Sequence, residues 1–83
     1  MFGLSFEDQL KIVVVECRKR SGLSQNDLAT LAGVGRTAVQ RLESGNMTIQ
    51  MDTLLKILKV LNINLHFETP FGKSLGALSF LSE

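Results

Sequence analysis

The sequence has few of the groups from which covalent or metal chemistry is built. Its 83 residues include one cysteine, Cys17, and one histidine, His66. One cysteine excludes an internal disulfide and favours a reducing compartment, and one cysteine with one histidine cannot make a structural zinc site. Cys17 lies in an apolar run and is expected in the core. His66 has no nucleophile or acid at a telling spacing, so we expect it at solvent or an interface, and we expect no enzyme activity, metal or cofactor.

The sequence also lacks long hydrophobic runs. None approaches the ~18 residues that a transmembrane helix needs, and the N-terminus has no charged region followed by an apolar block and a cleavage site. We therefore expect a cytoplasmic protein. Hydrophobic residues at 45% and charged residues at 20% fit one small folded domain. A core of this size is often marginal alone, and oligomerisation is a common remedy.

Charge is sparse overall but unevenly placed. The formal net charge is +1, yet residues 16–41 hold five basic and two acidic side chains. A local excess of positive charge, not the total, sets the field that a nucleic-acid partner would meet.

Apolar residues recur with helical spacing in four segments. The spacing predicts helices over residues 6–20, 25–32, 36–44 and 51–61. Ser5 and Ser24 are expected N-caps, and glycines 22, 33 and 45 are expected stops. The side chains expected to face the core are Phe6, Leu10, Val13, Val14, Cys17, Leu28, Ala29, Leu31, Ala32, Val39, Leu42, Met51, Leu54, Leu55, Leu58 and Leu61.

After the fourth helix the period changes to two. Apolar and polar residues alternate in "NINLHFET", which predicts a half-buried strand closed by Thr69-Pro70. A lone strand leaves its backbone groups unpaired, and the simplest partner is the same strand in a second copy. The fourth helix also carries a second apolar face. We therefore predict a homodimer, with interface residues Ile57, Val60, Ile63, Leu65 and Phe67.

Two interpretations compete for "GVGRTAVQRLESG", residues 33–45. A dinucleotide loop needs G-x-G-x-x-G after a strand, whereas Gly33 follows a helix and Ala38 stands at the third glycine position. The Gly-Lys-Ser/Thr of a phosphate loop is absent. The alternative is the tight turn of a helix-turn-helix, with the small residues Ala29 and Gly33 where the two backbones approach.

The helix over residues 36–44 would then turn four polar side chains outward, while Val39 and Leu42 hold it to the core. Arginine pairs with guanine, glutamine with adenine, and a threonine methyl with the thymine methyl. A merely solvated face would have the same composition, so these residues alone leave both readings open. The candidate base-contact residues are Arg36, Thr37, Gln40 and Arg41.

The stretch "LSQNDLATLAGVGRTAVQRLESG" resembles the helix-turn-helix of the lambda-repressor-like (Xre/Cro-type) bacterial regulators, and the likeness covers about residues 16–61. The following "TIQMDTLLKILKVLNINLHF" resembles the narrower group of HipB-type antitoxins. The resemblance implies an all-α, four-helix domain over residues 1–69 with a C-terminal strand that pairs across a dimer. It also implies a repressor of its own operon that binds a palindromic operator and acts as the antitoxin of a HipA-type kinase toxin.

The resemblance also assigns roles to single residues. Arg36, Thr37 and Arg41 match base-contact positions, with Gln40 secondary. The residues implied to contact the DNA backbone are Gln25, Asn46 and Thr48, and the residues implied to form a structural ion pair are Arg18 and Glu43. Two positions depart from the pattern, since Gly35 and Gln50 stand where better helix caps are usual.

The tail over residues 70–83 has no counterpart in that pattern. It is expected to be a short helix or a segment that docks on a partner through Leu75, Leu78, Phe80 and Leu81. Two further functions stay open: a stand-alone helix-turn-helix regulator, and a protein-interaction module with little DNA binding.

Overall fold

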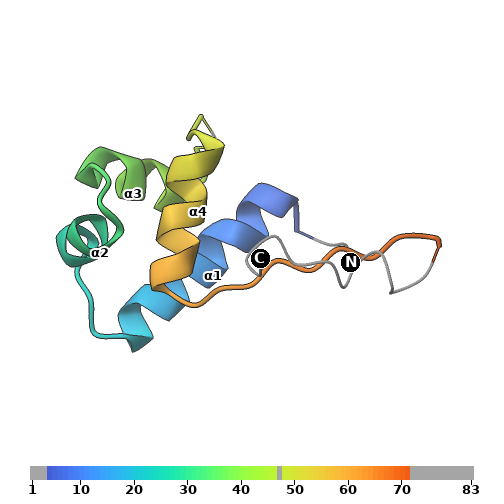
Figure 1. The fold of residues 1–83 in the computed structure, drawn as a ribbon, viewed down its shortest axis with the longest axis horizontal. Coiled ribbons are helices and arrows are strands. Elements are labelled where there is room, and N and C mark those ends of the chain that lie inside the picture. Colours follow the sequence, from blue (N-terminus) through green and yellow to red (C-terminus); the bar gives the residue numbers. More distant parts are fainter. Residues whose placement is uncertain (1–3, 47, 72–83) are drawn as a thin grey trace.

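The chain folds into four short helices (Figure 1). The computed structural model describes residues 4–46 and 48–71. Helix α2 packs against α3 and α4, and α3 packs against α1. The predicted bounds agree with the structure except that the third and fourth helices each end one residue earlier. The helices are α1 (Phe6–Arg20), α2 (Gln25–Ala32), α3 (Arg36–Glu43) and α4 (Met51–Val60).

The first two helices begin at side-chain caps, as predicted. Ser5 Oγ accepts from the Asp8 backbone N–H at 3.1 Å. At α2, Ser24 Oγ accepts from the Asp27 N–H at 2.9 Å, while the Asp27 carboxylate accepts from the Ser24 N–H at 3.0 Å. This reciprocal capping box satisfies two backbone donors that the helix itself leaves unbonded.

The other two helices begin without such help. Neither Gly35, before α3, nor Gln50, before α4, makes a side-chain capping bond. Both departures expected from the sequence are therefore present. Since helix ends without caps are less stable, α3 and α4 depend more heavily on the side chains that they bury.

Gly33 ends α2 in the left-handed conformation, with φ of 72°. Its N–H and that of Val34 close the end of the helix on the carbonyls of Thr30 and Ala29. A Cβ atom built on Gly33 would meet no atom within 4 Å. The prediction that Gly33 is small because two backbones approach there is therefore wrong. The position requires glycine for its backbone angle, which L-residues adopt at a cost.

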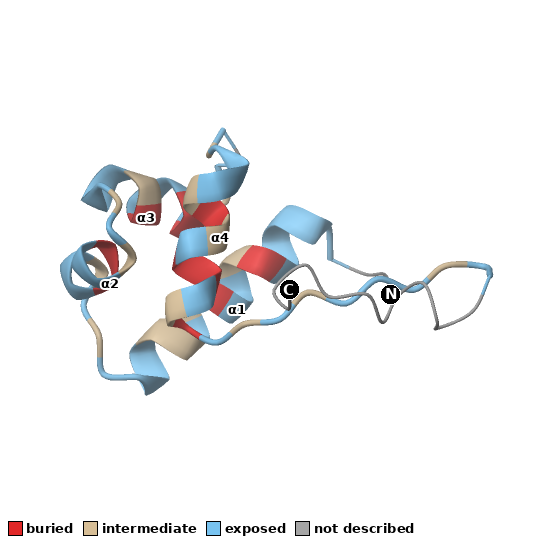
Figure 2. Ribbon diagram, in the orientation of Figure 1, coloured by how far each residue is buried: buried red, intermediate tan, exposed pale blue. Residues whose placement is uncertain are grey.

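One continuous core lies between the helices, and Figure 2 shows the buried segments of α1, α3 and α4 turned toward one another. Cys17, Ala32 and Leu55 pack at its margin, half-buried. The buried residues of the core are Leu10, Val14, Leu28, Ala29, Val39, Leu42, Leu54, Ile57, Leu58 and Leu61.

Four residues expected in the core are exposed instead: Phe6, Val13, Leu31 and Met51. Helical spacing correctly marks their side of the helix, but they lie at the edges of the apolar stripe. Four short helices leave those edges uncovered. Phe6 and Met51 each begin a helix, and both are more than half exposed, at 60% and 67%.

The prediction of a second, dimer-facing apolar side on α4 is wrong for Ile57. Its side chain is fully buried within the protomer, so it has no surface to offer to another chain. The reason is that Ile57 lies on the same helical stripe as Leu54, Leu58 and Leu61, all of which are buried in the core. Val60, on the other hand, is half-buried and packs at the core margin.

No strand is formed in residues 4–46 and 48–71. After α4 the chain runs extended past α1 and then beyond the helices (Figure 1), and the segment 63–69 has no regular secondary structure. Ile63 still docks through its N–H to the Leu58 carbonyl at 2.9 Å. A strand requires a neighbouring chain to pair with, so the predicted strand pairing stays a prediction.

Candidate nucleic-acid interface

Helix α3 separates its side chains by chemistry. Val39 and Leu42 are fully buried against the core. The four predicted base-contact residues are all exposed, and none of their side chains makes a hydrogen bond or ion pair with another described residue: Arg36, Thr37, Gln40 and Arg41. The helix is therefore held firmly from one side and presents unused donors and acceptors on the other.

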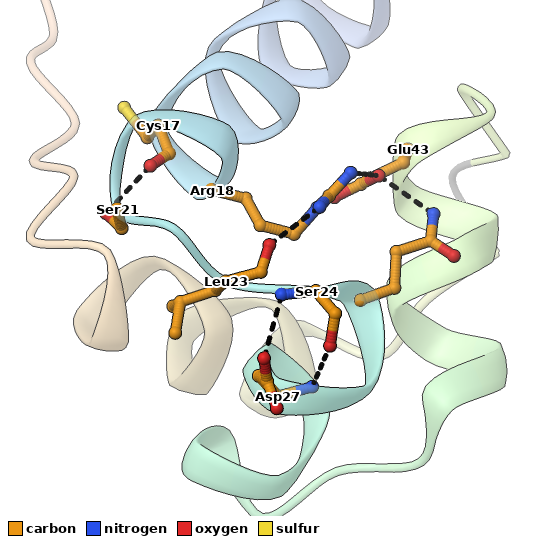
Figure 3. A network of polar contacts seen from close by, with 8 residues as sticks. Cys17, Arg18, Ser21, Leu23, Ser24, Asp27 and Glu43 are labelled. Atoms are coloured by element: carbon orange, nitrogen blue, oxygen red, sulfur yellow. Dashed lines mark hydrogen bonds and ion pairs between the residues drawn. The ribbon is translucent and has the colours of Figure 1, made fainter.

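The ion pair expected between Arg18 and Glu43 is present (Figure 3). Arg18 Nε donates to Glu43 Oε2 at 2.6 Å, and Nη2 donates to Oε1 at 3.0 Å. A third donor, Nη1, reaches the Leu23 carbonyl at 2.8 Å. One guanidinium thus ties α1, the loop before α2, and the end of α3 together.

The pair is well shielded from water, with side-chain exposures of 12% for Arg18 and 6% for Glu43. The hydrogen bonds to Glu43 raise the pKa of Arg18 above its ordinary value, against the opposing effect of burial. A fork-to-fork contact of this kind is the strong form of the arginine–carboxylate pair. It fixes the position of α3 relative to α1.

Gln25, expected to contact phosphate, has a bond inside the protein. Its Nε2 donates to Glu43 Oε1 at 2.9 Å. Nothing in the sequence spacing indicates this contact, because the two residues are 18 positions apart and lie on different helices. Gln25 is the first residue of α2 and is half-buried, so its amide lies at the edge of the Arg18–Glu43 pair.

Asn46 and Thr48, the other two residues expected at the DNA backbone, are joined in the loop after α3. Asn46 Oδ1 accepts from the Thr48 N–H at 3.0 Å and from its hydroxyl at 2.8 Å. The hydroxyl proton of Thr48 is therefore in use. Asn46 keeps both N–H groups of its amide unbonded within the described ranges, which makes it the better donor of the two.

A second exposed surface is apolar and lies on the side of Phe6. A groove of about 420 Å³ runs between the start of α1, the start of α4 and the extended segment. Leu65 and Phe67, both expected at a dimer interface, line it, and Ile63 lines a neighbouring hollow with Val13. Phe6 and Met51 also line the groove, and the sequence reading missed them because it assigned them to the core.

Other expected features fall outside this picture. His66 is exposed and lines the same groove. No cluster of His, Cys, Asp and Glu side chains in the described ranges could hold a metal ion. Within the same ranges, no helix combines the length and apolar character that crossing a membrane requires. The tail residues Leu75, Leu78, Phe80 and Leu81 lie outside the described residues.

Comparison with known proteins agrees with this geometry. The profile of the helix-turn-helix family matches residues 14–67. An uncharacterized HTH-type transcriptional regulator of Haemophilus influenzae is 33% identical over 73 residues, covering 83% of this chain and 64% of that protein. The chain thus spans less than two thirds of that relative's length.

Two solved structures share the fold. One is described as MDT Protein, and the other is a chain in the structure of a HipA-HipB-O2-O3 complex. Each superposes with a TM-score of 0.70 at 20% identity, covering 84% of this chain and 99% of the other.

Proposed function

Because the chain belongs to the helix-turn-helix family of DNA-binding transcription regulators, we propose that it is a sequence-specific repressor that binds a palindromic operator as a homodimer. The observation that carries the proposal is the exposed side of α3. Arg36, Thr37 and Arg41 lie there without internal partners, on a helix whose other side is locked into the core. We name these three residues, with Gln40, the reading face.

The chemistry of the reading face suits the major groove. Arginine donates two hydrogen bonds to guanine O6 and N7, and glutamine pairs in the same way with adenine. Gln25 and Asn46 lie at the start of α2 and beyond the end of α3, where amide N–H groups can bond the phosphates on either side of the groove. In a dimer, two reading faces would meet successive major grooves roughly 34 Å apart.

The homodimer is supported by the exposed apolar groove beside Phe6. A second copy laid along the extended segment would cover Leu65 and Phe67 and complete a two-stranded sheet. The proposed interface retains Val60, Ile63, Leu65 and Phe67 and omits the buried Ile57. Proline at Leu65 removes a backbone donor from that pairing. We expect Leu65→Pro to sediment as a monomer, and a dimer of unchanged affinity would contradict strand pairing.

We further propose that the protein is the antitoxin of a HipA-type kinase toxin and represses its own operon in the cytoplasm. This rests on the HipB-like sequence after Asn46 and on the fold shared with a chain of a HipA-HipB-O2-O3 complex. The candidate contacts to the kinase are the tail residues Leu75, Leu78, Phe80 and Leu81. Removing residues 71–83 should weaken co-purification with a kinase-like neighbour while DNA binding persists.

Fluorescence anisotropy tests the repressor directly, with the full chain and labelled DNA from upstream of its own gene. We expect tight binding at low salt that weakens steeply as salt rises, because phosphate contacts release counterions. An unrelated duplex of equal length is the control. Failure to bind at low salt would contradict a repressor. Co-purification with a protein partner in that case would favour an interaction module instead.

A further inference from the structure

The hydrogen bond from Gln25 to Glu43 decides which way the glutamine amide faces. The amide has two donor protons on Nε2 and an acceptor at Oε1. Its nitrogen lies 2.9 Å from Glu43 Oε1. The opposite orientation would place two oxygen acceptors against each other without a proton between them. Glu43 therefore excludes the orientation in which the amide carbonyl replaces the amide nitrogen.

The chosen orientation leaves one N–H of Gln25 unused. One proton of Nε2 is donated to Glu43, and no other bond of this amide to a described residue is formed. A phosphate oxygen accepts hydrogen bonds and cannot donate them at neutral pH, so only the N–H side of an amide can bind it. An amide free to rotate would present its carbonyl part of the time and would lose that fraction of its binding.

Arg18 offsets the negative charge that Glu43 places beside the Gln25 amide. A carboxylate beneath a phosphate-binding amide would repel the DNA backbone. Arg18 donates twice to the same carboxylate, at 2.6 and 3.0 Å, and its guanidinium carries the positive charge that every arginine has at neutral pH. The pair is nearly neutral as a unit, so Glu43 orients the amide without opposing the DNA.

We propose that Glu43, neutralised by Arg18, is a positioning residue for DNA binding that holds the Gln25 amide with its second N–H ready for a backbone phosphate. The inference rests on the proposed function, because it assumes that the protein binds DNA. It adds that Glu43, the last residue of α3, orients the side chain through which α2 contacts the DNA backbone. The position of α3 relative to α1 and the phosphate contact made by α2 therefore both depend on the Glu43 side chain.

The test compares the effect of Gln25→Ala in two backgrounds, with the full chain and labelled DNA. The second background is the double variant Arg18→Met and Glu43→Met, which removes the acceptor while leaving no buried charge unpaired, and such replacements are often tolerated. Thermal melting confirms that each variant is folded. In the wild-type background, Gln25→Ala should weaken binding to operator and unrelated duplexes alike, by about tenfold.

In the double-methionine background the same change should cost about fivefold or less, because an amide that can present either its N–H side or its carbonyl loses at least about half of its binding. Equal losses in the two backgrounds would overturn the role of Glu43. No loss in the wild-type background would show that Gln25 does not bind phosphate, while DNA binding itself, and hence the proposed function, would stand. Absence of DNA binding by the wild-type protein would remove the proposed function and this inference together.

A measurement on the unmodified protein gives an independent answer. In nitrogen-15 spectra of the wild-type chain, the Nε2 proton of Gln25 that is bonded to Glu43 should be shifted downfield from the usual position of a glutamine side-chain amide proton. Adding operator DNA should move the other proton and leave the first in place. Movement of both protons, or of neither, would contradict the proposal. In the same spectrum, the side-chain amide of Gln40 serves for comparison, because it is exposed and makes no internal bond.

Discussion

The two sides of α3 carry similar chemistry and use it in opposite ways. On the inner side, Arg18 from α1 and Gln25 from α2 both donate to Glu43, and the Arg18–Glu43 pair is largely removed from water. On the outer side, the side chains of Arg41 and Gln40 are exposed and make no bond to a described residue. The same residue types are structural in one place and available in the other. Burial decides between them, because buried polar groups require partners within the protein.

The largest expected effect comes from breaking the inner side. Arg18→Ala leaves the Glu43 carboxylate buried without its cation, which typically costs about 3–5 kcal/mol. Arg20→Ala is the matched control, because Arg20 pairs with Glu16 at 2.8 Å while both remain open to water, at 80% and 57% exposure. An exposed pair of this kind contributes about 0.3–0.5 kcal/mol. Urea unfolding of both variants measures the contrast.

Similar losses in Arg18→Ala and Arg20→Ala would mean that burial does not distinguish the two pairs. The comparison would then lose its basis, since the buried pair on the inner side of α3 would stabilise the fold no more than an exposed pair within α1.

The outer side should show the reverse pattern. Arg41→Ala should leave the free energy of unfolding nearly unchanged, because the Arg41 side chain makes no internal bond, and should cost about 1–3 kcal/mol of binding at one base pair. Arg20→Ala again serves as control, since it removes the same charge from α1. Anisotropy on a set of operator variants measures both. Equal weakening by the two changes on every duplex would assign Arg41 a general electrostatic role.

Much of this arrangement could be read from the sequence. Apolar spacing and caps such as Ser24 gave the four helices, because both signals are local. The outward placement of Arg36 and Arg41 followed from the same helical period. The Arg18–Glu43 pair came from resemblance to a family, since 25 residues separate the partners and no local rule connects them.

The remainder depends on tertiary packing. Whether an apolar side chain is buried is decided by which neighbour covers it, so Ile57 went into the core while Phe6 and Met51 stayed exposed. The Gln25–Glu43 bond was missed for the same reason. It joins α2 and α3, and residue spacing along the sequence does not predict how those two helices lie relative to each other. A strand over residues 63–68 depends on a second chain, which the sequence of one chain does not place.

Acid should weaken the capping box at the start of α2, because one of its two partners is the Asp27 carboxylate. Hydrogen bonds from Ser24, first from its backbone N–H and then from its side chain, lower the pKa of Asp27 from its ordinary value of 3.8. A carboxyl with a lowered folded-state pKa contributes stability that is present above 3.8 and is lost as the pH falls through the folded value. Urea unfolding across that range should show the capping box weakening only below pH 3.8.

Asp27→Asn keeps an oxygen that can accept from Ser24 but does not titrate. The stability difference between the wild type and this variant should be constant from neutral pH down to about 5 and should shrink below 3.8. A difference that stays constant throughout would contradict a charged capping box.

The smallest effect is expected where the outer side of α3 begins. Gly35 has extended angles, with φ of −75° and ψ of 149°, that serine adopts readily, and a Cβ there would meet no atom within 4 Å. Gly35→Ser supplies the missing capping hydroxyl and restricts the unfolded chain, which together should stabilise the fold by about 0.5–1 kcal/mol. For a domain of this size that raises the melting temperature by about 2–8 °C.

Gly35→Ala separates the two causes, because it restricts the unfolded chain equally but cannot cap. The expected order of melting temperature is serine first, with alanine close to the wild type, since alanine is a poor N-cap. Equal stabilisation by serine and alanine would show that α3 does not need a cap. The core side of the helix, through Val39 and Leu42, would then be sufficient to hold the reading face in place.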